Sequence, residues 1–279
     1  MANETKISQL SGALGAEISG IDVARIGDTD FASIYDAFLE FGVIALRDQN
    51  LSPEAFVATA KRFGSLAEYP FAEGLDGHPE ITVIIKEPHQ TSNFGGMWHT
   101  DTTYQPEPPK ATLLYAVETP AVGGDTLFAD MRLAYEQLSP GMRELLGNLH
   151  AINSSTLHAA SLRADHLKSG SMTGKEAAPR ALEAKHPVVQ THPETQRKGL
   201  YVNPAHTSMF IGMTREESAP ILDYLFRQQT RPELTCRLNW QPGTLAIWDN
   251  RSTQHCAIND YDGHRREMWR ITIKGDRPR

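Results

Sequence analysis

Apolar residues recur at helical spacing in the first quarter of the chain. Residues 30–41 place theirs three and four positions apart, which predicts a helix that ends at Gly42. A second helix is predicted from Ser52 and Pro53, which are typical of a helix start, to about Phe63. The short apolar run between these helices predicts a buried strand.

Two later helices are predicted from their capping residues. Ser139 and Pro140 predict the start of one helix. Its inward-facing residues are predicted to be Leu145, Leu146 and Leu149. Thr214 and Glu217 have the spacing of a capping box, and apolar residues follow them at helical intervals.

The remaining apolar runs are short and lie between glycines and prolines, as in strands. The predicted strands are residues 43–46, 81–85, 112–117, 126–130, 188–189, 199–203, 234–240, 244–248 and 269–274. Residues 154–184 are polar and weakly periodic, and we expect a lid or insertion there. No linker divides residues 1–279, so we expect a single domain that is mostly β with flanking helices, of jelly-roll type.

Composition narrows the choice of partners. There are 27 Lys and Arg against 34 Asp and Glu, a formal net charge of −7, which argues against nucleic acid. No apolar run approaches the roughly 20 residues that span a bilayer, and no signal peptide is visible. Cys236 and Cys256 form no disulfide pattern, so a reducing, cytoplasmic location is the expectation.

The candidate chemistry begins at His99 and Asp101, which are two residues apart. In extended backbone such residues point to the same side, so both could reach one metal ion. Two histidines and one carboxylate form the facial triad of non-haem iron(II) oxygenases. An isolated His-x-Asp more often has no function, so a third ligand from a distant strand is required.

His255 is the candidate for that third ligand, since it follows a buried strand and a turn. A histidine that only makes a hydrogen bond at a strand end is the alternative. His186 and His192 also lie near apolar strands and are the nearest rivals for this role.

Alternation in residues 266–273 places Arg266 and Arg270 on one strand face, roughly 13 Å apart. If that face is buried, each guanidinium requires an anion, and a carboxylate or sulfonate matches its planar fork. A solvated strand face is the alternative. Thr126 begins a predicted strand after two glycines, and its hydroxyl could point inward beside an anion.

Together these parts resemble the taurine dioxygenase / 2,4-dichlorophenoxyacetate dioxygenase (TauD/TfdA) family of iron(II)- and 2-oxoglutarate-dependent oxygenases. The motifs are Trp98-His99-Thr100-Asp101, Gly123-Gly124-Asp125-Thr126, Trp248-Asp249-Asn250-Arg251 with His255, and Arg266 with Arg270. The resemblance extends over nearly the whole chain and implies a double-stranded β-helix, cupin-like, with the metal at one mouth. It also implies a homodimer or a homotetramer.

The resemblance implies a role for most of the site residues. His99, Asp101 and His255 would be the iron(II) ligands and catalytic residues. Thr126, Arg266 and Arg270 would bind the cosubstrate 2-oxoglutarate. Arg270 would also meet the acidic group of the substrate, and Tyr69 and Thr102 are our further candidates for substrate contacts, since the hydroxyl of Tyr69 could donate a hydrogen bond. Dioxygen, 2-oxoglutarate and a small acidic substrate would yield succinate, carbon dioxide and a hydroxylated product.

The substrate residues depart from the taurine enzymes, which carry His-Pro where Tyr69 and Pro70 stand here. A polar residue expected shortly before Trp98 is also missing, since Gly95-Gly96-Met97 occupies that stretch. A sulfonate such as taurine, an alkyl sulfate, or an aryloxy or other carboxylate therefore all fit. Two alternatives are a catalytically silent protein that binds a small acid, and a zinc hydrolase with the same triad.

Overall fold

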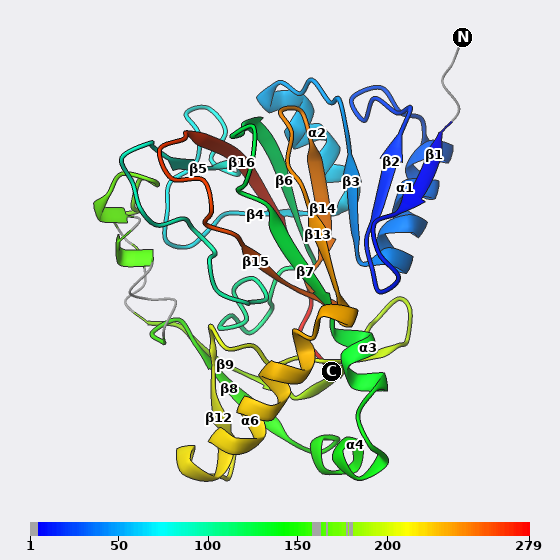
Figure 1. Cartoon of the computed structure of the whole chain (residues 1–279), viewed down its shortest axis with the longest axis vertical. Coiled ribbons are helices and arrows are strands. Elements are labelled where there is room, and N and C mark those ends of the chain that lie inside the picture. Colours follow the sequence, from blue (N-terminus) through cyan, green and yellow to red (C-terminus); the bar gives the residue numbers. More distant parts are fainter. Residues whose placement is uncertain (1–4, 158–162, 166, 177, 179–180) are drawn as a thin grey trace.

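The computed structural model describes residues 5–157, 163–165, 167–176, 178 and 181–279. The fold is mostly β with helices on its outside, as expected (Figure 1). Part of the predicted lid, residues 154–184, lies outside the described residues. In the described part of the chain, no helix is both long enough and apolar enough to cross a membrane.

The largest sheet has eight strands in the order β1-β2-β3-β14-β6-β16-β4, and β5 also pairs with β16. Only β2 and β3 run parallel, and the other pairs are antiparallel. Its strands are β1 (Lys6–Gln9), β2 (Ala16–Ser19), β3 (Val43–Leu46), β4 (Leu66–Ala67), β5 (Thr82–Lys86), β6 (Ala111–Glu118), β14 (Leu245–Asp249) and β16 (Arg266–Ile273).

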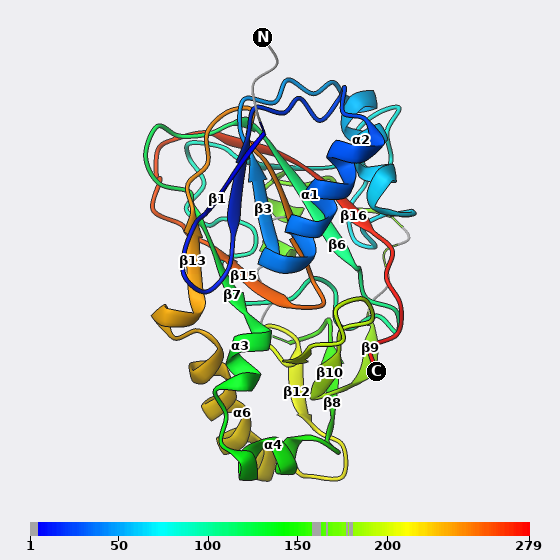
Figure 2. The same cartoon turned by 90° about the vertical axis from the view of Figure 1, so that its right-hand side faces the viewer.

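Two helices cover one face of this sheet (Figure 2). They are α1 (Asp28–Phe41) and α2 (Pro53–Phe63). Gly42 ends α1 in the left-handed region, with φ 71°, and its N–H bonds to the carbonyl of Phe38. Ser52 caps α2 by accepting a hydrogen bond from the N–H of Ala55. Both helix starts and ends therefore lie within two residues of the prediction.

A second sheet has three strands, β7 (Thr126–Asp130), β13 (Thr235–Leu238) and β15 (Thr253–Ala257), in the order β13-β7-β15. It packs on the other face of the large sheet. Phe128 from β7 contacts Trp248 from β14, and Met268 from β16 belongs to the same buried cluster. Period-two alternation explains this layering, because β3 sends Ile44 to the helices and Val43 to the second sheet.

A third group of elements forms the lower end of the molecule in Figure 1. It consists of α3 (Met131–Glu136), α4 (Pro140–Leu146), β8 (His150–Ser154), β9 (Glu183–Pro187), β10 (Val189–Thr191), β11 (Lys198–Leu200), β12 (Thr207–Phe210), α6 (Arg215–Gln229) and η1 (Pro232–Leu234). The capping box of Thr214 and Glu217 is present at the start of α6. Ser155 and Leu182 join the two ends of the predicted lid through a backbone hydrogen bond of 2.9 Å.

Three details of the sequence prediction were wrong. Leu145 is 45% exposed, because α4 ends at the fully buried Leu146 and turns only one face to the core. The strand predicted over residues 199–203 is confined to β11, and the one over 234–240 begins as a short 3-10 helix. An apolar run in the sequence indicates which residues are buried. The end of a strand, however, is set by where the neighbouring strand stops pairing with it.

Candidate metal centre

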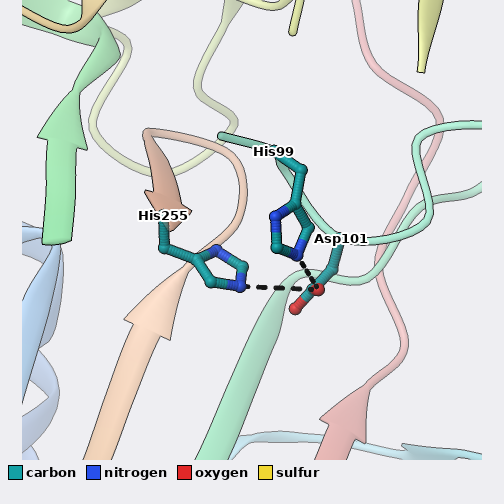
Figure 3. A group of neighbouring side chains, drawn as sticks. All are labelled: His99, Asp101 and His255. Carbon is teal, nitrogen blue, oxygen red and sulfur yellow. Dashed lines mark ion pairs between the residues drawn. The ribbon is translucent and has the colours of Figure 1, made fainter. Parts of the chain in front are cut away.

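The two histidines of the candidate site are brought together by backbone pairing. His99 and His255 form an isolated antiparallel bridge, with N–H to carbonyl distances of 3.0 and 2.9 Å. His255 lies on β15, whereas His99 lies in the long connection between β5 and β6. Their ring centroids are 4.1 Å apart, so both imidazoles face the same point (Figure 3).

Asp101 completes the group, and its carboxylate points toward both imidazole rings (Figure 3). Its Oδ1 lies 3.6 Å from Nε2 of His99 and 3.8 Å from Nε2 of His255. One donor atom from each residue lies within 4.8 Å of the other two, which is close enough to share one ion. Contrary to the expectation from the sequence, the backbone is not extended from His99 to Asp101: only His99 pairs, Asp101 lies in a turn, and Thr102 adopts φ 45°.

Hydrogen bonds orient the donor atoms of the triad. Nδ1 of His99 donates to the carbonyl of Met97 at 2.7 Å, which leaves the lone pair of Nε2 free for a metal. The hydroxyl of Thr112 on β6 donates to Oδ2 of Asp101 at 2.6 Å. That hydroxyl accepts from the amide of Asn250 at 3.0 Å. The carboxylate is therefore held in one rotamer before any metal binds.

The protonation states also suit metal binding. Burial by itself raises the pKa of Asp101, but Arg270 and the two histidines outweigh burial and hold this pKa well below its usual range. Burial, with His99 adding to it, keeps the pKa of His255 well below the usual value for histidine. At neutral pH the site therefore offers a carboxylate and a neutral imidazole, the forms that bind divalent metals.

The two arginines of β16 are both buried on the face that turns to the triad. Nη2 of Arg270 lies 2.9 Å from Oδ1 of Asp101, an ion pair that lacks the direction of a hydrogen bond. Nε of Arg266 has no hydrogen-bond partner among the described residues. Burial lowers the pKa of Arg266, although Tyr261 and Asp125 partly compensate. Among the described residues, therefore, no group fully compensates the positive charge of this guanidinium.

Thr126 and Arg266 line one cavity together with the triad. Oγ1 of Thr126 accepts from Nε1 of Trp240 at 2.9 Å, so its own proton is free to be donated. Gly124 precedes it with φ 71° and donates its N–H to Asp260 at 2.7 Å, which fixes the turn. This cavity is therefore lined both by the metal donors and by a hydroxyl and a guanidinium.

Tyr69 and Thr102, the predicted substrate residues, line an adjoining cavity. Arg270 belongs to both cavities and lies over the ring of Tyr69, with 5.4 Å from Cζ to the centroid. The other lining residues are Phe94, Gly95, Gly96, Met97, His99, Asp101, Tyr104, Arg163, Ala205 and His206. The structure thus brings all eight sequence-predicted site residues around two connected spaces.

The rival histidines have other roles. Nε2 of His186 lies 2.8 Å from the carbonyl of Thr103, and Nε2 of His192 lies 2.9 Å from Asp249.

Two residues of the site, Thr112 and Arg163, were not predicted from the sequence. Thr112 carries no local signal, because only the register between β6 and β14 brings it to Asn250.

Comparison with known proteins agrees with this geometry. Residues 6–272 match the family described as taurine catabolism dioxygenase TauD, TfdA family. The chain is 31% identical to an alpha-ketoglutarate-dependent sulfonate dioxygenase of Saccharomyces cerevisiae, over 99% of this chain and 68% of that one. It is 33% identical to an alkylsulfatase of Acinetobacter baylyi, over 98% of this chain and 86% of that one.

A solved structure from Burkholderia xenovorans, described as a putative alpha-ketoglutarate-dependent taurine dioxygenase, superposes with a TM-score of 0.84. It is 34% identical, and the match covers 99% of this chain and 91% of that one. The chain therefore belongs to the TauD/TfdA family and is a taurine dioxygenase-like oxidoreductase that depends on 2-oxoglutarate, also called alpha-ketoglutarate.

Proposed function

We propose that His99, Asp101 and His255 bind iron(II) and that the enzyme hydroxylates a small organic acid. Two imidazoles and one carboxylate suit this borderline metal and leave coordination positions open. When bound, iron and 2-oxoglutarate supply the oxidising chemistry, in which dioxygen, cosubstrate and substrate yield succinate, carbon dioxide and the hydroxylated product. The protein contributes metal ligands, orientation and a cavity shielded from water.

The cosubstrate site in this proposal is the cavity between the triad and Thr126. Arg266 would bind the distal carboxylate of 2-oxoglutarate through its guanidinium, and the free proton of Thr126 would add a second hydrogen bond. Arg270 would remain beside Asp101 and face the cosubstrate's other end. The observation that carries the proposal is the buried Arg266, whose Nε is unpaired among the described residues.

The substrate in this proposal is a sulfonate, an alkyl sulfate, or an aryloxy or other carboxylate. The names of the relatives support this class, since one acts on sulfonates and another is an alkylsulfatase. If the hydroxylated carbon bears the sulfate or aryloxy oxygen, the product is unstable and breaks down to a carbonyl compound. Tyr69, Thr102 and Arg270 would line the space that this substrate occupies.

The organisation that accompanies this function is also a proposal. The two sheets that pack through Phe128 and Trp248 would form a double-stranded β-helix, within a single domain over residues 1–279. Residues 154–184 would serve as the lid over the substrate space. The free thiols of Cys236 and Cys256 fit the cytoplasm. Light scattering would distinguish the proposed homodimer from a homotetramer.

Replacement of Arg266 tests the cosubstrate site. We expect Arg266→Met to raise the KM for 2-oxoglutarate about tenfold to a hundredfold, because a hydrogen-bonded charge contributes roughly 1.5–3 kcal/mol. Succinate formation measures the KM, and the anaerobic charge-transfer absorption of the iron–2-oxoglutarate complex measures binding. Saturating 2-oxoglutarate should restore most of the turnover.

Arg265→Met is the matched control, because Arg265 comes directly before β16, forms ion pairs with Glu118 and Glu267, and does not line the cosubstrate cavity. Equal affinity for 2-oxoglutarate in both variants would remove Arg266 from the cosubstrate site.

The wild-type enzyme also tests the class of reaction. Product formation without oxygen consumption would indicate hydrolysis, and absence of turnover with every acid would indicate a silent binding protein.

A further inference from the structure

A second arginine faces the substrate cavity from the predicted lid. Arg163 is half-buried and lines the same space as Tyr69, Arg270 and two members of the triad, His99 and Asp101. Its guanidinium donates to the carbonyl of Ser155 at 2.9 Å, and its Cζ lies 3.9 Å from the ring centroid of Phe71. Two neutral groups therefore hold the side chain in place, and no carboxylate among the described residues compensates its positive charge.

The two arginines of this cavity differ in their electrostatic surroundings. Arg270 is fully buried and already paired with Asp101. Arg163 forms no ion pair with any carboxylate in the described part of the chain, where it contacts a carbonyl and an aromatic ring. A half-buried charge of this kind gains most from an anion that arrives with the ligand.

The rest of the cavity wall offers an ammonium group no acidic partner besides Asp101 among the described residues. Its side chains are mainly apolar or aromatic, with Phe94, Met97 and Tyr104 among them. Asp101 is its one acidic lining residue among those described, and that carboxylate belongs to the triad. An ammonium group on the substrate would find no free carboxylate and would meet two guanidinium groups.

We propose that Arg163 binds the anionic group of the substrate and selects acids with an apolar body over acids that carry an ammonium group. This inference rests on the proposed function and narrows its substrate class. Alkyl or aryl sulfonates and sulfates without an amine fit the wall, whereas taurine would bury an unpaired cation. Loss of one charge-assisted hydrogen bond predicts roughly a tenfold to a hundredfold loss of affinity.

Two ligands of equal shape test the selectivity. Propane-1-sulfonate differs from taurine by a methyl group in place of the ammonium group. Calorimetry on the full chain loaded with iron(II) and 2-oxoglutarate, without oxygen, should give a Kd at least about tenfold lower for propane-1-sulfonate. Comparable affinity of the wild-type protein for both ligands would refute the proposed selectivity without any variant.

Variants of Arg163 assign the effect to this residue. Arg163→Met should raise the Kd for propane-1-sulfonate about tenfold to a hundredfold, and Arg163→Lys should restore part of the affinity. Arg163→Glu should narrow or reverse the preference over taurine. The charge-transfer absorption with 2-oxoglutarate should stay unchanged, which a merely structural defect would not allow. Arg197→Met is the control, because Arg197 pairs with Glu136 on the surface.

The outcomes separate this inference from the proposed function. Succinate release with propane-1-sulfonate, together with an unchanged Kd in Arg163→Met, would overturn the role of Arg163 and leave the oxygenase intact. Ligand binding that depends on Arg163, without succinate release from any acid, would overturn the proposed reaction and support the anion site.

Discussion

At the scale of single residues, the carboxylate of Asp101 is held by groups that no local pattern connects. Nε1 of Trp248 donates to Asn250 at 3.1 Å, Asn250 donates to Thr112, and Thr112 donates to Asp101. Every donor in this chain of hydrogen bonds points toward the negative charge. Such a chain strengthens each bond and fixes the rotamer of the ligand.

Replacement of Thr112 tests this positioning role. Thr112→Val keeps the shape of the side chain but removes the proton donated to Asp101, so the carboxylate can rotate and loses a charge-assisted bond. We expect iron(II) affinity to fall about tenfold to a hundredfold, the range found for groups that orient metal ligands. Anaerobic titration with iron(II) measures the affinity.

Thr59→Val is the matched control, because Thr59 is buried on α2 and its hydroxyl donates to the carbonyl of Ala55, away from the metal site. Its iron affinity should match that of the wild type. A Thr112→Val variant with full metal affinity would show that the backbone turn alone orients Asp101.

At the scale of elements, the ends of helices and strands decide where the site residues lie. The turn after β14 is closed by Asp249, which accepts from the N–H of Arg251 at 2.9 Å and from His192. Burial raises the pKa of Asp249, but Arg251 and His192 outweigh burial and lower it. This turn sets the register of β15 and so places His255 opposite His99.

The capping box of α6 gives a prediction for the stability of an element. Thr214 accepts from the N–H of Glu217 and Glu217 accepts from the N–H of Thr214, so two otherwise unpaired donors are satisfied. Thr214→Ala should lower the free energy of unfolding by about 1 kcal/mol, measured by urea denaturation. Leu222 and Leu225 tie α6 to a buried cluster, so the loss reaches global unfolding.

Glu216→Ala is the control for that measurement, because Glu216 lies in the same first turn but is not part of the capping box. It should cost only a few tenths of a kcal/mol, from the lost charge near the helix N-terminus. An equal loss in both variants would contradict the role of the capping box.

At the scale of the whole molecule, buried polar side chains join the layers. Nε2 of His186 on β9 lies against the carbonyls of Thr103 and Gln105, which follow directly after the metal-binding turn. Its Nδ1 has no partner among the described residues. Burial lowers the pKa of His186, although these two hydrogen bonds partly oppose the shift. The folded protein therefore keeps this imidazole neutral.

This pKa shift predicts how stability changes with pH. Below the ordinary histidine pKa of 6.5, the unfolded chain takes up a proton at His186 that the folded protein does not, so stability falls as pH falls. The stability that the neutral His186 contributes is fully present above pH 6.5. Below that pH, the free energy of unfolding falls by at most about 1.4 kcal/mol per pH unit because of this residue. In His186→Gln, stability measured from pH 7 to pH 5 should fall less steeply.

His89→Gln provides the comparison, because His89 is exposed and remains in water in both states. The stability of the His89→Gln variant should depend on pH in the same way as that of the wild type. If His186→Gln kept the full wild-type slope, the acid sensitivity would have to come from other buried groups.

The sequence by itself determined the features that depend on neighbours in the chain. The starts of α2 and α6 follow from Ser52 and Thr214, because a capping side chain bonds to backbone two or three residues away. The alternation in β16 follows from the period of two, and it places Arg266 and Arg270 on one buried face. The ordered motifs were sufficient to identify the family.

Only the tertiary structure decided the features that depend on register between distant segments. His99 reaches His255 through one backbone bridge, and Thr112 reaches Asn250 through the pairing of β6 with β14. Arg163 faces the substrate cavity because Ser155 and Phe71 hold its side chain there. Each of these contacts joins residues whose separation carries no periodic signal, because cooperative packing of the layers, rather than local conformational preference, selects which strands meet.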